Sequence, residues 1–371
     1  MSGALELTER LIAAESVTPA RGAVFDVLEA ALVPLGFAVH RFVAGAETDA
    51  PVENLFAMRA GAGRHFAFAG HLDVVPPGAG WTSDPFVPTR RGDLLHGRGA
   101  VDMKGAIAAF VAAVAARPNH AAPISLIVTG DEEGPAVHGT RALIDWMGAR
   151  GIAPDLCLVG EPTSVARLGD MIKIGRRGSV NMWVRSAGRQ GHVAYPHLAE
   201  NPIPRLIAAL AEIERIALDT GTDWFQPSNI EITDLAVGNP AHNVIPAAAE
   251  ARLSIRFNDL HTGASLTAMI EEVAARHGCT LEAIVSGEPF LTPPGAFSEL
   301  VSAAIVEATG VEPELSTSGG TSDARFLARL CPVVEFGLVN ATMHKLDEAV
   351  AVQDLDLLAD IYAGILDRVA R

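Results

Sequence analysis

The chain has 371 residues, of which 49% are hydrophobic, and its formal net charge is −16. A single hydrophobic core rarely organises this many residues, so we expect two domains. The acidic charge, with no prominent run of Lys or Arg, argues against the broad basic surface that binds nucleic-acid phosphates.

Two features of the chain predict that the protein is soluble. Residues 1–19 carry Glu6, Glu9 and Glu15 among apolar residues, a pattern that fits an amphipathic helix better than a secretory signal. The longest apolar stretch, residues 106–116, is far shorter than the roughly 20 residues that cross a bilayer. We therefore expect no membrane partner.

The cysteines indicate the compartment. Cys157, Cys279 and Cys331 are odd in number and widely spaced, and none has the spacing of metal ligands. This pattern predicts buried free thiols in a reducing compartment, so we expect the protein in the cytoplasm.

The hydrophobic pattern changes twice along the chain. Short apolar runs alternate with helical patterns through residues 1–175 and again after about residue 291, which predicts an α/β domain with a mixed, largely parallel sheet and helices on both faces. Residues 249–257 instead alternate apolar and polar side chains, as in a half-solvated strand. Further strands are expected at 180–185 and 230–235, and helices near 204–218 and 265–277.

We interpret this change as an insertion. The expected catalytic domain is discontinuous, with residues 1–178 and 291–371. The expected insert, residues 179–290, is an α+β domain whose antiparallel sheet has one face covered by helices.

Potential ligands follow the apolar runs of the outer segments. The runs at 66–70, 124–129, 156–159 and 331–339 lead, in turn, to His71 and Asp73, to Asp131, Glu132 and Glu133, to Glu161, and to His344. In open α/β sheets, side chains beyond the carboxyl ends of the strands meet in one crevice. We expect these groups to converge.

His71 and Asp73 are two residues apart on extended chain, so their side chains point the same way. Asp73 can accept the second ring N–H of His71 and fix its tautomer, as in many metal sites. A solvated pair at a strand end is the alternative. Asp102, in a glycine-punctuated loop before an Ala-rich helix, fits a helix N-cap, or a carboxylate that bridges two cations.

The adjacent Glu132 and Glu133 would repel each other if both were buried and charged. A divalent cation removes that cost, and one glutamate can bind metal while the other accepts a proton from water, as hydrolysis at neutral pH requires. Solvated surface acids are the alternative, and Glu161 or His344 alone would be structural. Together the two histidines and three carboxylates give each of two ions three ligands when Asp102 is shared. Nitrogen and oxygen ligands suit zinc, with cobalt or manganese as alternatives.

Five motifs resemble the M20 family of metallopeptidases and deacylases: HLD at 71–73, DMKG at 102–105, DEEG at 131–134, GEPT at 160–163 and the single residue His344. The resemblance implies that His71 and Glu161 bind one metal ion and that Glu133 and His344 bind the other. It also implies that Asp102 bridges both ions and that Glu132 is the general base. Asp73 is included with Glu132 among the catalytic residues.

Other strings resemble the branch of that family which hydrolyses N-succinyl-LL-2,6-diaminopimelate to succinate and LL-2,6-diaminopimelate, in lysine and diaminopimelate biosynthesis. They are WTSDPF at 81–86, GRRGS at 175–179, GHVAYP at 191–196, NP at 201–202, NVIP at 243–246, SGGTSD at 318–323 and NATMH at 340–344. The paired arginines of GRRGS distinguish this branch, and guanidinium groups suit a small tricarboxylate substrate. Solvated arginines are the alternative. The substrate-binding residues implied by the resemblance are Arg176, Arg177, Ser179, Tyr195, Asn243, Arg256, Gly320, Thr321 and Asn340.

The resemblance also implies a homodimer in which His192 and Asn243 reach into the partner's site. His192 would stabilise the oxyanion of the tetrahedral intermediate, and the insert would serve for dimerisation and as a lid. Without the resemblance, His192 beside Gly191 fits a structural turn residue. Three other functions stay open: hydrolysis of another N-acyl amino acid such as N-acetylornithine, hydrolysis of a small peptide, and a scaffold without activity.

Overall fold

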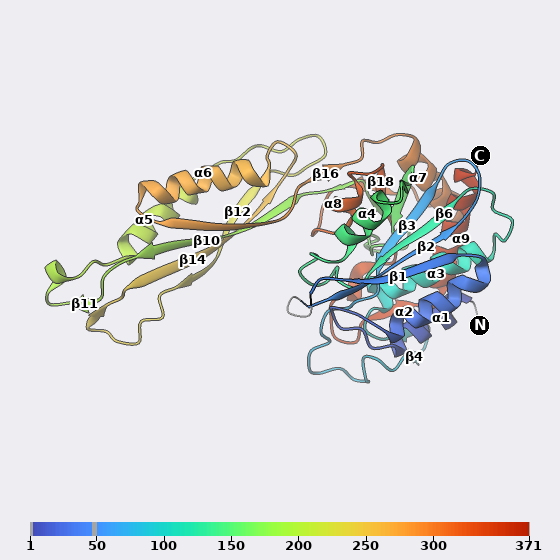
Figure 1. The fold of residues 1–371 in the computed structure, drawn as a ribbon, viewed down its shortest axis with the longest axis horizontal. Helices are drawn as coiled ribbons and strands as arrows, with labels where there is room; N and C mark the ends of the chain where they lie inside the picture. Colours follow the sequence, from blue (N-terminus) through green and yellow to red (C-terminus); the bar gives the residue numbers. More distant parts are fainter. Residues whose placement is uncertain (1–2, 47–49, 371) are drawn as a thin grey trace. The chain divides into compact units, whose positions relative to one another are not determined.

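The computed structural model describes residues 3–46 and 50–370. The chain divides into two compact units, which are drawn in Figure 1. Unit 1 comprises Met1–Ile174, Thr292–Ser316 and Ser322–Arg371, and unit 2 comprises Gly175–Leu291 and Thr317–Thr321.

This division differs in three places from the boundaries expected from the sequence. Residues 175–178 and Leu291 group with unit 2, because β9 (Gly175–Arg176) pairs with β16 (Phe290–Leu291) inside that unit. Thr317–Thr321 also group with unit 2, and the main-chain oxygen of Gly320 there accepts a hydrogen bond from Arg176 Nη1 at 3.1 Å. So short a return carries no hydrophobic pattern of its own, and the sequence did not indicate it.

An eight-stranded sheet forms the centre of unit 1, in the order β1-β2-β6-β3-β7-β18-β8-β17. Its strands are β1 (Ala38–Ala44), β2 (Val52–Arg59), β3 (Phe66–His71), β6 (Ile124–Thr129), β7 (Leu156–Val159), β8 (Met171–Lys173), β17 (Glu314–Ser316) and β18 (Val333–Glu335). The pairs β6-β3, β3-β7, β7-β18 and β8-β17 are parallel, and the remaining pairs are antiparallel. The predicted mixed α/β sheet is confirmed.

Helices cover both faces of this sheet. Phe56 of β2 and Ala69 of β3 pair with the same residue of β6, so Phe68, next to Ala69, points to the opposite face from Phe56. The ring of Phe56 lies 5.3 Å from Trp146 of α4, whereas Phe68 stacks at 4.2 Å on Phe110 of α3. The helices of unit 1 are α1 (Gly3–Ala13), α2 (Ala23–Leu32), α3 (Gly105–Ala115), α4 (Thr140–Gly148), α7 (Ala296–Thr309), α8 (Ala324–Leu327) and α9 (Val352–Val369).

Shorter elements complete unit 1. A small sheet has the order β19-β5-β4. It contains β4 (Thr89–Arg91), β5 (Leu94–His96) and β19 (Ala349–Ala351), and the helical turns are η1 (Val33–Leu35), η3 (Ala100–Lys104) and η5 (Asn340–Thr342). The expected strand at 331–339 is regular only over β18, and the chain beyond it runs into η5.

Unit 2 has an antiparallel sheet in the order β12-β14-β10-β15. The predicted alternation is found in β14, where Leu253 and Ile255 are buried against Met182 of β10, Leu206 of α5 and Ile270 of α6. The elements of the unit are β9, β10 (Gly178–Ala187), β11 (Gly191–His192), β12 (Asn229–Ala236), β13 (Val244–Ile245), β14 (Ala248–Phe257), β15 (Thr280–Gly287), β16, α5 (Ile203–Ile213), α6 (Gly263–Arg276) and η4 (Pro196–Leu198).

Two further features concern membrane-spanning helices and the cysteines. In the described part of the chain, no helix combines the length and apolar character that a membrane span requires. All three cysteines are free, with Cys157 and Cys279 buried and Cys331 partly exposed.

Candidate metal centre

The predicted ligands lie at one edge of the unit 1 sheet. His71 ends β3, Glu132 and Glu133 follow the end of β6, and Glu161 follows the end of β7. These three strands are adjacent and parallel, so their carboxyl ends meet at the same edge. The convergence predicted from the strand ends is therefore seen for these side chains.

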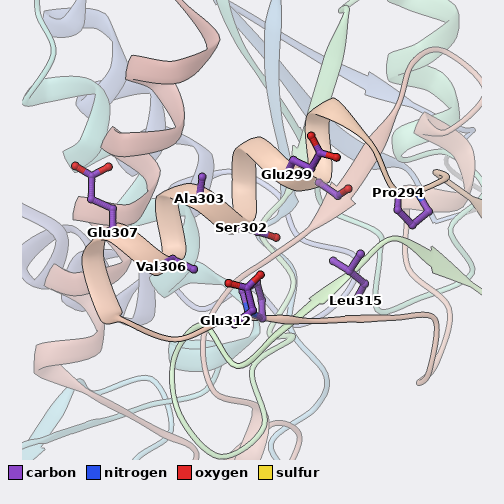
Figure 2. Close-up of a pocket in the computed structure, with 10 residues that line it drawn as sticks. Pro294, Glu299, Ser302, Ala303, Val306, Glu307, Glu312 and Leu315 are labelled. Carbon is purple, nitrogen blue, oxygen red and sulfur yellow. The ribbon is translucent and has the colours of Figure 1, made fainter.

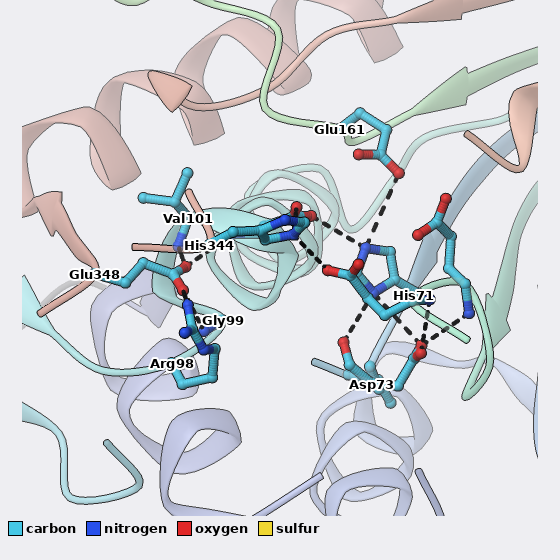
Figure 3. Close-up of polar contacts among 12 residues, drawn as sticks. His71, Asp73, Arg98, Gly99, Val101, Glu161, His344 and Glu348 are labelled. Carbon is cyan, nitrogen blue, oxygen red and sulfur yellow. Dashed lines mark hydrogen bonds and ion pairs between the residues drawn. The ribbon is translucent and has the colours of Figure 1, made fainter. Parts of the chain in front are cut away.

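Two histidines lie against the two oxygens of one carboxylate (Figure 3). Nε2 of His71 is 3.1 Å from Oδ1 of Asp102. Nε2 of His344 is 3.1 Å from Oδ2 of the same group. Asp102 thus occupies the position between the histidines that a bridging ligand requires.

Each histidine also faces a glutamate. His344 Nε2 lies 2.8 Å from Glu133 Oε1, and His71 Nε2 lies 3.9 Å from Glu161 Oε1. His344 has a φ of 59°, which non-glycine residues adopt infrequently and which often marks functional positions.

Asp73 holds the main chain of the two adjacent glutamates. Its carboxylate accepts the backbone N–H of Glu132 at 3.2 Å and that of Glu133 at 2.9 Å. Nδ1 of His71 lies 2.9 Å from the main-chain oxygen of Asp73, and 3.5 Å from the carboxylate. The nearer acceptor for the His71 ring is thus the carbonyl, whereas the sequence suggested the side chain.

The pKa values of three side chains in the site are shifted from their usual values. Hydrogen bonds to Asp102 and Glu133 raise the pKa of His344 to about 10. Burial opposes charging of His71, but hydrogen bonds to Asp102 and Asp73 outweigh it and raise that pKa well above its usual value. Burial, and then the negative charge of Glu161, raise the pKa of Glu132. The carboxylates around both histidines therefore favour positive charge at this site.

The donor set fits divalent cations. Ligand atoms about 2 Å from a common tetrahedral ion lie about 3.3 Å from one another. The nitrogen–oxygen distances of 3.1 Å at Asp102 and 2.8 Å at Glu133 are close to that spacing. Potential ligand atoms of His71, Asp102 and Glu133 lie within 4.8 Å of one another, as do those of His71, Glu132 and Glu161.

Several predicted substrate residues gather at one end of unit 2. Arg177 donates from Nη1 to Asn229 Oδ1 at 3.1 Å, and Asn229 pairs in register with Arg256. Burial, and then the positive charge of Arg177, lower the pKa of Arg256, so the two guanidinium groups influence each other. Arg176 contacts Gly320, as described above, with the half-buried Thr321 next in the chain. Ser179 is buried opposite Arg256 in the β10–β14 pair.

The other predicted residues of unit 2 lie elsewhere. His192 and Asn243 are exposed and adjacent, because β11 pairs with β13 and Val193 donates to the main-chain oxygen of Asn243 at 3.1 Å. The ring of Tyr195 is 5.8 Å from that of His192. In unit 1, Asn340 begins η5, and its N–H donates to the main-chain oxygen of Ser164 at 2.9 Å.

Three buried groups near the metal centre were missed by the sequence analysis. Glu348 and Arg98 form a buried ion pair at 2.7 Å, and the negative charge of Asp323 adds to the raised pKa of Glu132. Burial raises the pKa of Asp323 itself to about 6. Asp323 closes the SGGTSD string, so its position was noticed but no role was assigned.

A groove on unit 1 lies outside this chemistry (Figure 2). It has a volume of about 580 Å³ and lies against α7 and β17. It is lined by Pro294, Ser298, Glu299, Ser302, Ala303, Val306, Glu307, Glu312, Pro313 and Leu315. None of the predicted site residues belongs to this set, so the groove is distinct from the metal centre.

Residues 67–368 match the family model described as peptidase family M20/M25/M40. The chain belongs to peptidase family M20/M25/M40. This range includes all five predicted metal ligands as well as Asp73 and Glu132. The metal-dependent chemistry of the family agrees with the His, Asp and Glu groups described above.

Relatives within the family match nearly the whole chain. A succinyl-diaminopimelate desuccinylase of Rhizorhabdus wittichii is 67% identical, over 98% of this chain and 97% of the relative. A protein of the same name from Novosphingobium aromaticivorans is 68% identical, over 97% of this chain and 96% of the relative.

Two solved structures have the same fold. The metallo-carboxypeptidase Sso-CP2 of Sulfolobus solfataricus has a TM-score of 0.80 at 16% identity, with 100% of both chains covered. Human carnosine dipeptidase 1 has a TM-score of 0.73 at 20% identity, with 99% of this chain and 96% of that chain covered. At these identities the likeness concerns the fold alone.

Proposed function

We propose that the chain hydrolyses N-succinyl-LL-2,6-diaminopimelate to succinate and LL-2,6-diaminopimelate, as a step of lysine and diaminopimelate biosynthesis. The carrying observation is the convergence of His71, Asp102, Glu133, Glu161 and His344 at one sheet edge in a chain of this family. The names of the relatives at 67% and 68% identity support the choice of substrate. A cytoplasmic location stays a prediction.

The site is proposed to hold two divalent metal ions. His71 and Glu161 would bind one, Glu133 and His344 would bind the other, and Asp102 would be shared. Zinc suits this set of nitrogen and oxygen ligands, with cobalt or manganese as alternatives. When bound, such ions lower the pKa of water and stabilise developing negative charge.

Glu132 is proposed as the general base. Its raised pKa brings the carboxylate closer to the value at which a group both accepts and returns a proton near neutral pH. It would accept the proton of the attacking water and deliver it to the nitrogen of the leaving amine. Asp73 would hold Glu132 in place through the main chain.

The arginines of unit 2 are proposed to bind substrate carboxylates. Arg177 and Arg256 are half-buried, and their mutual repulsion would be relieved by an anion between them. The remaining substrate contacts would come from Arg176, Ser179, Tyr195, Asn243, Gly320, Thr321 and Asn340. A substrate with three carboxylates matches this cationic group in an otherwise acidic chain.

A homodimer is proposed because of the length of β10. Arg177 precedes the first residue of β10 and His192 follows its last, and β11 lies at the end of unit 2 away from β16 (Figure 1). Ten residues of extended chain span about 30 Å, which is too far for both side chains to contact one small substrate within a single chain. His192 and Asn243 would therefore serve the partner's site.

The surface around His192 supports association. Val193, Tyr195 and Leu198 are exposed by 46%, 56% and 62%, and apolar side chains gathered on a surface favour contact with another protein. The proposed interface would lie at this end of unit 2, which would also act as a lid.

Initial rates on three substrates test the function. The purified, zinc-loaded chain should hydrolyse N-succinyl-LL-2,6-diaminopimelate at least 100-fold more efficiently, in kcat/KM, than N-acetylornithine or a dipeptide. A reversed order would replace the proposed substrate. A rate that is unchanged after removal of metal would overturn the proposed enzyme class.

A further inference from the structure

A buried carboxylate lies beneath the loop that carries Asp102. Glu348 is 0% exposed and Arg98 is 2% exposed. Arg98 Nη1 donates to Glu348 Oε2 at 2.7 Å (Figure 3). A charge removed from water in this way must be compensated by several hydrogen bonds.

Most of that compensation comes from the main chain of the loop. Oε2 of Glu348 accepts the N–H of Gly99 at 3.1 Å, and Oε1 accepts the N–H groups of Val101 at 2.8 Å and Asp102 at 3.2 Å. Asp102 has φ −119° and ψ 97°, so the helical main chain is interrupted within η3, where Lys104 N–H reaches back to the main-chain oxygen of Gly99 at 2.9 Å. Glu348 supplies the acceptor that the loop lacks.

The same ion pair also contacts the segment that carries His344. Arg98 Nη1 donates to the main-chain oxygen of Lys345 at 3.3 Å. The backbone N–H of Gly97 donates to the main-chain oxygen of Glu348 at 2.9 Å. Segments about 250 residues apart in the sequence are thereby joined behind the metal centre. The two segments joined in this way carry Asp102 and His344, whose Oδ2 and Nε2 atoms lie 3.1 Å apart.

We propose that Glu348, held by Arg98, is a positioning residue for one of the two metal sites, the one formed by Asp102, Glu133 and His344. This inference rests on the proposed two-metal function. The site of His71 and Glu161 shares Asp102 but depends on Glu348 less, because its two other ligands are fixed by the central sheet: His71 ends β3 and Glu161 follows β7.

Titration of the metal-stripped chain with cobalt(II) tests the inference. Binding is measured by calorimetry and by visible absorption. In the wild type, Arg98 and the backbone N–H groups of the loop donate to the Glu348 carboxylate. In Glu348→Gln, the side-chain amide would place its own N–H groups against some of these donors. The wild type should bind two ions. In Glu348→Gln, one of them should bind about 10- to 100-fold more weakly, with an altered absorption spectrum, as for other residues that orient metal ligands. The affinity for the other ion should change less than about two-fold.

Asp347→Asn is the matched control. Asp347 is adjacent in the chain but accepts hydrogen bonds from Thr82, and asparagine tolerates its φ of 53°. This variant should bind both ions as the wild type does.

A double variant identifies which ion is affected. His344→Asn should leave one ion bound, and adding Glu348→Gln should then cause no further loss, because both changes act on the same site. Equal weakening of the remaining ion would overturn the inference, and so would wild-type binding of both ions by Glu348→Gln. If Glu348→Gln does not fold, Glu348→Asp decides, since it keeps the charge and should weaken the same single ion to a smaller extent.

The titration uses no substrate. A chain that binds both ions but does not cleave the succinyl substrate would therefore refute the proposed function and leave the role of Glu348 to be judged by cobalt binding. A wild-type chain that binds fewer than two ions would overturn the role of Glu348, whatever its activity.

Discussion

Asp73 lies behind Glu133, with its Oδ2 accepting the Glu133 backbone N–H at 2.9 Å. Oδ1 accepts the N–H of Glu132 in the same way. One buried carboxylate thus orients the proposed base and a proposed ligand through the main chain, a role that adds to its 3.5 Å contact with the His71 ring.

Asp73→Asn should lower kcat by about 10- to 100-fold, because an amide offers one acceptor oxygen and presents a donor to the second N–H group. Steady-state kinetics and metal content would measure the effect. Asp170→Asn is the control, since Asp170 also accepts N–H groups of a loop, those of Val165, Ala166 and Arg167. A kcat within two-fold of wild type for Asp73→Asn would contradict the assigned role.

Glu132→Gln should fold, bind both metal ions and lose about 10²- to 10⁴-fold in kcat, because the amide cannot accept the proton of water. Glu133→Gln should instead lose metal, since Glu133 faces His344. Metal analysis together with kcat separates the two glutamates. Near-normal turnover by Glu132→Gln would remove it as the base.

Arg177→Lys should raise KM for N-succinyl-LL-2,6-diaminopimelate about ten-fold, or ~1.4 kcal/mol, because an ammonium group cannot make the bidentate contact of a guanidinium group. Arg185→Lys is the control. Arg185 also lies in unit 2 but is paired with Glu250 and Glu282, so this variant should leave KM unchanged. Initial rates over a range of substrate concentrations check both. A larger fall in kcat than rise in KM would assign Arg177 to the chemical step.

Mixing two inactive variants tests the shared site. In a dimer of one Glu132→Gln chain and one His192→Ala chain, only one of the two sites would have both groups if His192 acts across the interface. Random reassociation should then restore about a quarter of wild-type activity. If His192 acts within its own chain, the mixture would stay as inactive as its components.

The pH dependence of the stability of the metal-free chain follows in part from His344. Its pKa rises from 6.5 to about 10 on folding, so its contribution to stability is complete below pH 6.5 and is lost as the pH rises through 10. Lys104 acts in the opposite direction, since burial lowers its pKa from 10.5 to about 7.

Comparison with His344→Asn separates these contributions. With metal removed by a chelator, the wild type should have a higher Tm than His344→Asn. This difference in Tm, the excess, should shrink as the pH rises from 6.5 to 10. Thermal unfolding at several pH values measures it. An excess that stays constant over this range would show that His344 is not held between Asp102 and Glu133.

His71, Glu133 and Glu161 could be predicted because they lie at or just beyond the ends of β3, β6 and β7, and the carboxyl ends of adjacent parallel strands meet at one edge of a sheet. The alternation of β14 likewise revealed a sheet with one solvated face. Glu348 could not be predicted in this way. Its hydrogen bond to Gly99 joins residues 249 positions apart, and such a contact leaves no periodic pattern near either residue.

The acceptor for the His71 ring was also beyond sequence reasoning. Residue spacing places Asp73 beside His71, but the main-chain geometry after β3 decides whether the carbonyl or the carboxylate is nearer. The same holds for Thr317–Thr321, whose place in unit 2 depends on hydrogen bonds to residues distant in the sequence.

In the proposed dimer, each chain contributes Arg177 to one active site and His192 to the other. The length of β10 sets the distance between these two residues. Deletion of two residues from β10 and two from the paired β14 would keep every side chain on its original face, yet shorten the unit by about 7 Å. Such a chain would retain its core and both metal sites while displacing His192 from the partner's substrate. Homologues that conserve all the ligands but differ in the length of β10 and β14 would thus have lost the reaction without losing a catalytic residue.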